Sequence, residues 1–245
     1  MKALLKKELR SLFFSPLAYM VAGIVALMNG RVFCVLLQLL ASPMSQVQED
    51  LLSLFFGGTF FFWLSLIAMV PMLTMRLISE EKRSGCIELL MTAPITDCQI
   101  ICAKFFSVFI FYIFLWIPSF LYTFLLIFLG NFDWNIWILC LLGVLSIGAM
   151  LLSMGLMFSC FFTHQLASGG MTLAMLLFYF MLGFSQSLVQ IPWFQTFLDI
   201  VWPLSIMRAL GAGQLDLAQL VFLLMMTFFH LYVAVKILES RRWKN

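Results

Sequence analysis

The charged residues of this chain are few, and many of them lie in one segment, RLISEEKRSGCIELLMTAP, which runs from Arg76 to Pro94. Only 10% of all residues are charged, yet this segment has both signs: Arg76, Glu80, Glu81, Lys82, Arg83 and Glu88. If the chain spans a membrane, a loop whose only role was to set its orientation there would need Lys and Arg but no acidic residues. The mixed signs favour a docking surface that recognises a partner by charge complementarity, with a simply solvated loop as the alternative.

Other residues that could do chemistry are sparse. His164 and His230 lie far apart, and neither belongs to a recognisable nucleophile or metal motif. The stretch GVLSIGA at Gly143 lacks the Lys of a phosphate-binding loop and lies in an apolar run. Six cysteines show no paired metal spacing, and most are expected to be small buried hydrophobes: Cys34, Cys86, Cys98, Cys102, Cys140 and Cys160. We expect no catalytic site, metal site or cofactor in this chain, and no nucleic-acid partner.

The elements that position these residues are predicted to be membrane-spanning helices. The chain has 245 residues and is 64% hydrophobic, so it has too little polar surface to cover a water-soluble globule. A helix needs about 20 apolar residues to cross the hydrocarbon layer. Six runs qualify: 17–41, 54–75, 105–130, 136–162, 169–190 and 217–238. The sequence predicts an all-α integral membrane protein with one domain over residues 1–245.

Shorter helices are expected outside the spans. Residues 1–15 place Leu5 and Leu12 on one helical face and Lys6 and Arg10 on another, which predicts an amphipathic helix in the inner interface. Ser15-Pro16 should end this helix. The connection between the fifth and sixth runs is too rich in Trp, Phe and Leu for a solvated loop. It predicts one or two short helices at the outer surface.

The segment 76–104 is predicted to have its own local structure. Ser84-Gly85 should interrupt the helix that continues from the second span, and CIELLMTA can form about two further turns before Pro94. Thr96 and Gln99 have the spacing of a capping box, which predicts the start of the next helix.

Basic residues predict the orientation. Twelve of them fall on one side if the N-terminus is cytoplasmic: Lys2, Lys6, Lys7, Arg10, Arg76, Lys82, Arg83, Lys104, Lys236, Arg241, Arg242 and Lys244. Only Arg208 falls in an outer loop, which predicts a multi-pass protein with both termini cytoplasmic. Arg31 lies within the first span, either as an outer-border anchor or as a residue lining a substrate path. His230, in the last span, is expected to be hydrogen-bonded between helices, with an ion-coupling residue of a secondary transporter as the alternative.

Three stretches resemble one protein family. Residues 81–94, EKRSGCIELLMTAP, are similar to the pattern E-R-R-S-G-T-L-E-L-L-L-T-S-P of ABC-2-type transporter permeases, with Cys86 where the family usually has Thr. The start, KKELRSLFFSPLAYM, resembles the family's interfacial helix and first span. The end of the chain, which includes Gly213 and Asp216, resembles the closing span of the gliding-motility permease subfamily, although the basic residue usual before Gly213 is absent.

The resemblance implies a permease subunit in the bacterial cytoplasmic membrane. Two six-span chains, identical or homologous, would pair, and each would rest on a cytoplasmic ATPase subunit that binds ATP and Mg. Segment 76–104 would then couple the ATPase to the membrane through Glu81, Arg83, Gly85, Glu88 and Pro94.

The implied cargo is an amphipathic, lipid-linked or polymeric molecule. Alternatively, the subfamily match implies an envelope or motility machine with an auxiliary envelope protein. An ion-driven secondary transporter and a non-transporting structural subunit are the rival functions. A secondary transporter would need ionisable residues near mid-membrane, and the predicted spans contain almost none apart from Arg31.

Overall fold

The computed structural model describes residues 2–41, 55–56, 60–88, 95–128, 133–188 and 192–242, and all regular structure in these ranges is helical. Six helical stretches within them are long and apolar enough to cross a membrane. They are Pro16–Val35, Trp63–Arg83, Asp97–Thr123, Trp134–Phe161, Gln165–Leu182 and Leu217–Ser240. Their number and order match the six predicted runs, so the all-α membrane fold is confirmed.

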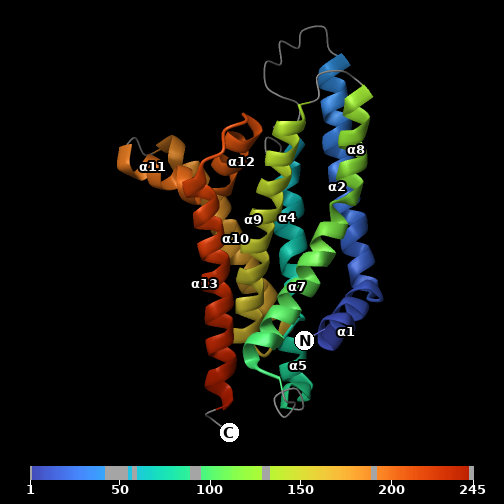
Figure 1. Ribbon diagram of the computed structural model, residues 1–245, viewed down its shortest axis with the longest axis vertical. Helices are drawn as coiled ribbons and strands as arrows, with labels where there is room; N and C mark the ends of the chain where they lie inside the picture. The colour runs from blue at the N-terminus through green and yellow to red at the C-terminus, as the bar shows by residue number, and fades with distance from the viewer. Residues whose placement is uncertain are drawn as a thin grey trace.

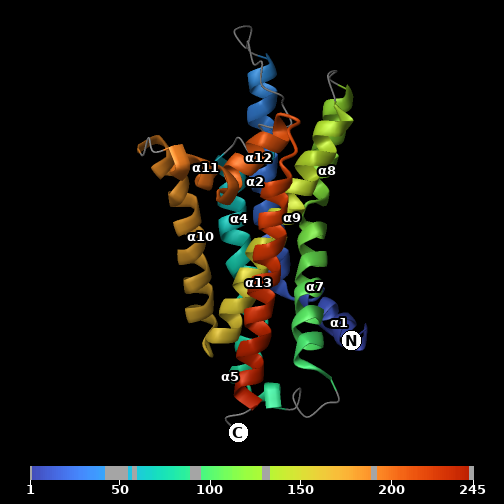
Figure 2. The same cartoon turned by 60° about the vertical axis from the view of Figure 1, so that its left-hand side comes forward.

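The long helices stand side by side in one bundle (Figures 1 and 2). They are α2 (Pro16–Ala41), α4 (Phe60–Thr74), α7 (Asp97–Leu115), α8 (Ile117–Phe128), α9 (Trp134–Phe161), α10 (Gln165–Leu188) and α13 (Leu217–Arg242). Helix α9 is central and contacts α4, α7, α10 and α13. Both chain termini lie toward the same end of the bundle, which is called the termini end below (Figure 1).

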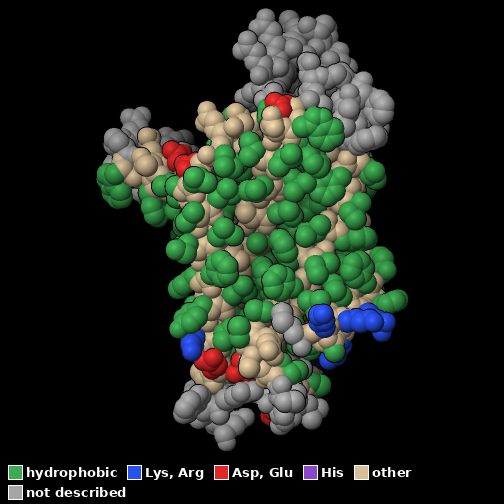
Figure 3. Space-filling model, viewed as in Figure 1, with side chains coloured by type: hydrophobic (Ala, Val, Ile, Leu, Met, Phe, Trp, Pro, Cys, Tyr) green, Lys and Arg blue, Asp and Glu red, His purple; other side chains and the backbone are tan. Residues whose placement is uncertain are grey.

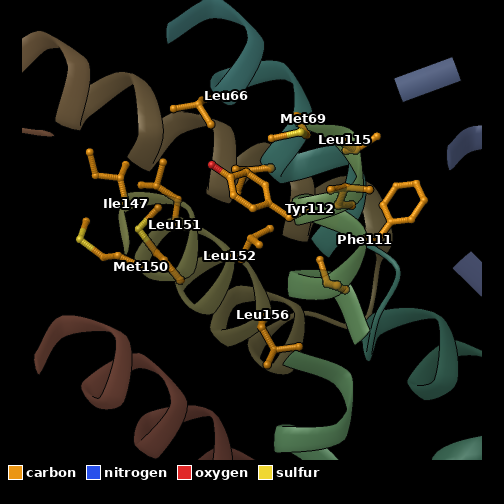
Figure 4. Close-up of a cluster of buried hydrophobic side chains, with 14 of the residues drawn as sticks. Leu66, Met69, Phe111, Tyr112, Leu115, Ile147, Met150, Leu151, Leu152 and Leu156 are labelled. Carbon is orange, nitrogen blue, oxygen red and sulfur yellow. The ribbon is translucent and has the colours of Figure 1, made fainter. Parts of the chain in front are cut away.

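The core forms where small residues of α9 let its neighbours approach closely. Gly148 lies against the ring of Tyr112 from α7, and Gly155 lies against Thr74 from α4; a Cβ at either glycine would overlap these side chains. The Tyr112 hydroxyl donates to the carbonyl of Val144 at 2.9 Å. Around Tyr112, buried side chains from α4, α7 and α9 fill the space (Figure 4). Packing of small residues against large ones therefore holds the bundle centre, as expected for membrane helices.

Helix α1 (Lys2–Phe13) lies across the termini end and packs against α7. Leu4 is buried, and the Phe13 ring makes edge contacts with Phe111 and Phe114 at centroid distances of 5.1 and 5.2 Å. Helix α2 begins at Pro16, because proline suits the first position of a helix. The predicted break at Ser15-Pro16 is confirmed.

The helix of the third span begins at the predicted cap, ahead of the predicted apolar run, and is interrupted near its middle. Helix α7 begins at Asp97, eight residues before the predicted boundary at 105, because Thr96 caps it: its hydroxyl accepts from the Gln99 amide at 3.3 Å. The helical pattern is interrupted at Trp116, and α8 follows. Pro118 has no amide hydrogen to donate to the preceding turn, which explains the interruption.

Two short helices connect α10 to α13, namely α11 (Pro192–Val201) and α12 (Pro203–Gly211). Helix α12 does not simply cover the surface, since Ile206, Met207 and Leu210 are fully buried. A Cβ at Gly143 of α9 would lie 2.6 Å from Leu210 and 2.7 Å from the sulfur of Met207. The absence of a side chain at Gly143 therefore makes room for α12 against the central helix.

Candidate functional site

The second span is interrupted where the charged segment begins. Helix α4 ends at Thr74, residues 75–78 form turns, and a short helix, α5 (Ser79–Arg83), follows. The sequence predicted an interruption only at Ser84-Gly85. Residues 75–78 are called the span-2 break below. A break inside a helix leaves amides and carbonyls without their usual partners, and buried groups of this kind need other hydrogen bonds.

Helix α9 supplies the acceptors for the break. The buried Ser159 hydroxyl accepts from the amides of Ile78 and Ser79 at 3.0 and 3.1 Å. In return, the Lys82 ammonium donates to the carbonyl of Cys160, in the last turn of α9. These bonds give partners to two amides at the start of α5 and to a carbonyl near the end of α9. The two helix ends therefore stabilise each other.

Helix α7 supplies a hydrogen-bond donor, Lys104, for a carbonyl of the break. Lys104 is 1% exposed, and its ammonium lies 2.7 Å from the carbonyl of Leu77 and 2.7 Å from Oε1 of Glu81. Its third acceptor, at 3.3 Å, is Oε1 of Glu8 on α1. An ammonium has three hydrogens, so all of its donors are used. Lys104, Glu8 and Glu81 are called the Lys104 cluster; it joins α1, α5 and α7 at the span-2 break.

Beyond the cluster, the chain turns outward. Arg83, Cys86 and Glu88 are exposed, in contrast to the half-buried Glu81. Gly85 has φ of 73°, a left-handed conformation that glycine adopts without a steric penalty. The predicted interruption at Ser84-Gly85 is therefore confirmed. One side of this segment is attached to the bundle, and the other is available for contact.

A cavity of about 330 Å³ adjoins the Lys104 cluster. It lies between α1, the first turn of α2, the end of α4 and α5, and Lys104, Glu8 and Glu81 form part of its wall. Near α1, at the termini end, Lys and Arg side chains gather beside a broad band of hydrophobic side chains (Figure 3). The lining of the cavity contains both charged residues, such as Lys104 and Glu81, and apolar residues, such as Leu12 and Leu73.

The remaining predicted site residues lie elsewhere. Arg31 is exposed on α2. Gly213 has φ of 75° in the turn before α13, and the Asp216 carboxylate accepts from the Ala218 amide at 2.9 Å. Pro94 lies outside the described residues. The structure thus brings Glu81 to the Lys104 cluster, but does not bring Arg31, Gly213 or Asp216 to it.

The sequence does not indicate the other two members of the cluster, Lys104 and Glu8. From the sequence, Lys104 is only one of the twelve inner basic residues, and Glu8 has no indicated role. A signal for Lys104 existed: it is the one charge in the apolar stretch IICAKFFSVF, which the cap at Thr96 places inside a helix. Nothing local pointed to Glu8, because only tertiary packing brings α1 to α7.

Two side-chain expectations had opposite outcomes. Nδ1 of His230 lies 3.4 Å from the Ser153 hydroxyl of α9, which is the expected hydrogen bond between helices. The expectation that most cysteines are buried was wrong: Cys140 and Cys160 are buried, Cys102 is intermediate, and Cys34, Cys86 and Cys98 are exposed. Cys34 lies in the first span, where an apolar side chain can face lipid as well as the core, and Cys86 lies in the exposed segment after α5.

Comparison with known proteins connects this fold to one family. No curated protein matched the chain. A family model described as "ABC-2 family transporter protein" matches residues 51–239, a range that contains α4 to α12, most of α13 and the span-2 break with its Lys104 partner. The match covers more than half of the chain, so this protein belongs to the ABC-2 transporter family.

Proposed function

We propose that this chain is the membrane-spanning permease subunit of an ATP-driven transporter, in which a separate cytoplasmic subunit binds ATP and Mg and hydrolyses ATP. Membership of the ABC-2 transporter family supports the permease role directly. Two permease chains, identical or homologous, pair in the proposed complex. Each rests on one ATPase subunit at the termini end.

The observation that carries the proposal is the two-sided segment after the span-2 break. On its inner side, Glu81 is bonded to Lys104, and Lys82 to the end of α9. On its outer side, Arg83 and Glu88 are exposed and of opposite sign. A displacement of α5 by a docked partner would therefore pull on α1, α7 and α9 together. This connection suits transmission of ATP-driven motion into the bundle.

The proposal gives each residue a distinct role. Arg83 and Glu88 contact the ATPase, Gly85 forms the turn that presents them, and Glu81 positions the segment against the bundle. Pro94 ends the coupling segment. Arg31, exposed on α2, either anchors the span at the outer border or faces the path of the cargo. Gly213 and Asp216 shape the connection into the last span.

The same proposal places the chain in the bacterial cytoplasmic membrane, with both termini cytoplasmic. The shared position of the termini and the basic side chains around α1 support this orientation (Figures 1 and 3). The proposed cargo is an amphipathic, lipid-linked or polymeric molecule. A role in an envelope or motility machine, with an auxiliary envelope protein, is the form that the subfamily resemblance favours.

Cross-linking from Cys86 tests the docking surface. Cys86 is exposed next to Gly85, so a variant that keeps this cysteine alone can be treated with a bismaleimide in the complex with its co-purified ATPase. The matched control has Gln214→Cys as its only cysteine; Gln214 is exposed in the connection between α12 and α13. We expect a permease–ATPase product from Cys86 and none from the control. An intact, ATP-hydrolysing complex without the Cys86 product would contradict the proposal.

A further inference from the structure

The cavity beside the Lys104 cluster has the properties of a binding site for a small amphipathic group. Its volume, about 330 Å³, is within the range of ligand sites. Lys7, Glu8, Arg76, Glu80, Glu81 and Lys104 provide its charges. Its apolar walls come from the start of α2 and the end of α4, which include Leu17 and Leu73. Charged and apolar walls side by side suit a molecule with a polar head and a hydrocarbon tail.

The cations of the cavity are not equivalent. Lys104 uses its three hydrogens on Glu8, Glu81 and the Leu77 carbonyl, so it has none left for a ligand. Lys7 and Arg76 are exposed at the rim. An anionic ligand group would therefore bind to Lys7 and Arg76 and not to the buried ammonium.

The carboxylates of the cavity provide a position for a cationic group of the ligand. In the described structure, Glu8 and Glu81 each contact Lys104 through Oε1, and Oε2 of each remains able to accept. Glu80 adds a third carboxylate at the exposed side. Three carboxylates and three cations make the charges of the lining sum to zero. A ligand with one anionic and one cationic group matches this wall better than a purely anionic one.

We propose that this cavity binds the head group of a phospholipid that carries a primary amine, of the phosphatidylethanolamine type, from the inner leaflet. The phosphate lies between Lys7 and Arg76, and the ammonium donates to the free oxygens of Glu8 and Glu81 or to Glu80. The acyl chains leave along the apolar walls near Leu17 and Leu73. The bound lipid thereby contacts α1, α2, α4 and α5, and stabilises the span-2 break independently of which cargo is transported.

The chemistry of the head group predicts that the cavity binds some phospholipids more tightly than others. A quaternary choline has no hydrogens to donate to the carboxylates, and a glycerol head group carries no positive charge. Each charge-assisted hydrogen bond contributes about 1.5 to 3 kcal/mol, so losing one weakens binding by roughly tenfold or more. We expect phosphatidylethanolamine to bind roughly tenfold more tightly than phosphatidylcholine or phosphatidylglycerol.

The test is lipid retention by the delipidated full chain, measured by native mass spectrometry during titration with each of the three lipids. The double variant Lys7→Gln with Arg76→Gln should weaken phosphatidylethanolamine binding by roughly tenfold or more. The matched control, Lys6→Gln with Arg10→Gln, removes the same charge from exposed positions of α1 that do not line the cavity. It should bind like the unaltered chain.

Three results of the titration would overturn the proposal. One is equal binding of the three lipids, and another is an equal loss in the cavity variant and its control, which would indicate general surface attraction. The third is full competition by soluble glycerophosphoethanolamine, which would indicate a water-soluble ligand. A photoactivatable phosphatidylethanolamine on the unaltered chain gives a test that needs no variant. Labelling should map to residues near Leu17 and Leu73, and labelling only elsewhere would refute the site.

Discussion

The buried ammonium of Lys104 pairs with the half-buried Glu81 beside the span-2 break, with Nζ and Oε1 2.7 Å apart and the lysine 1% exposed. The same ammonium reaches Glu8 and the Leu77 carbonyl, so its charge is fully compensated. A buried charge is tolerated only with such partners. The pair therefore joins the charged segment to the third span by a contact that neither element could form alone.

Removal of the Lys104 charge should destabilise the protein strongly. Lys104→Met leaves two carboxylates and a carbonyl without their common donor, and breaking a buried pair in this way costs about 3 to 5 kcal/mol. Lys236→Met is the matched control, because its pair with Glu239 is 53% and 39% exposed and such pairs contribute about 0 to 1 kcal/mol. Reversible unfolding in mixed micelles measures both. Equal losses would mean that the Lys104 cluster is not a structural link.

Ser159→Ala should loosen the span-2 break. The substitution removes the acceptor of two amides, Ile78 and Ser79, and each buried amide left unpaired costs about 1 to 3 kcal/mol. Hydrogen exchange of these two amides should accelerate. In the control Ser146→Ala, the lost hydroxyl bonds only within its own helix, to Leu142 and Gly143, so exchange at the break should stay unchanged. Unaltered exchange in Ser159→Ala would show that the hydroxyl does not hold the break.

Alanine at Gly155 and at Gly170 should have opposite effects. A Cβ at Gly155 would overlap Thr74, and overpacking of a core costs about 1 to 3 kcal/mol. Gly170 has no atom within 4 Å of the added Cβ, and alanine stabilises a helix interior by about 1 kcal/mol relative to glycine. The free energy of unfolding should fall in Gly155→Ala and rise slightly in Gly170→Ala. A change of the same sign in both variants would contradict the close contact of α9 with α4.

The two glutamates of the coupling segment should have different effects when substituted. Glu88 is exposed, so Glu88→Gln should change the free energy of unfolding by no more than about 0.5 kcal/mol, yet lower the substrate-stimulated ATPase rate of the complex. Glu81→Gln should lower both the free energy of unfolding and the ATPase rate, because it weakens the bond to Lys104. Glu81→Ala with Glu88→Ala should abolish transport in chains that still insert. Normal transport by this double variant would show that the segment is only a solvated loop.

Maleimide labelling in intact cells should separate the two ends of the bundle. A membrane-impermeant maleimide should label Gln214→Cys and should not reach Cys86 until the membrane is opened. The physical basis is the excess of basic side chains at the termini end, which favours a cytoplasmic location. Labelling of Cys86 from outside would reverse the proposed orientation.

The sequence by itself determined the class of the protein, the number of spans and several helix ends. Apolar runs of sufficient length can cross a bilayer only as helices or closed barrels, because every backbone group must be paired there. Local chemistry also determined the cap at Thr96, the start of α2 at Pro16 and the turn at Gly85, because each depends on residues close in the chain. These features needed no information about neighbouring helices.

Tertiary structure alone decided what happens at residues 75–78 and around Lys104. At the break, the amides of Ile78 and Ser79 donate to Ser159, some 80 residues later in the chain. The carbonyl of Leu77 accepts from Lys104. Glu8 joins the cluster from 96 residues away. The periodicity of the sequence indicates which face of a helix is apolar, but in a membrane an apolar face can lie against lipid or against another helix. The contacts that hold the coupling segment therefore depend on close packing between helices, which no local pattern encodes.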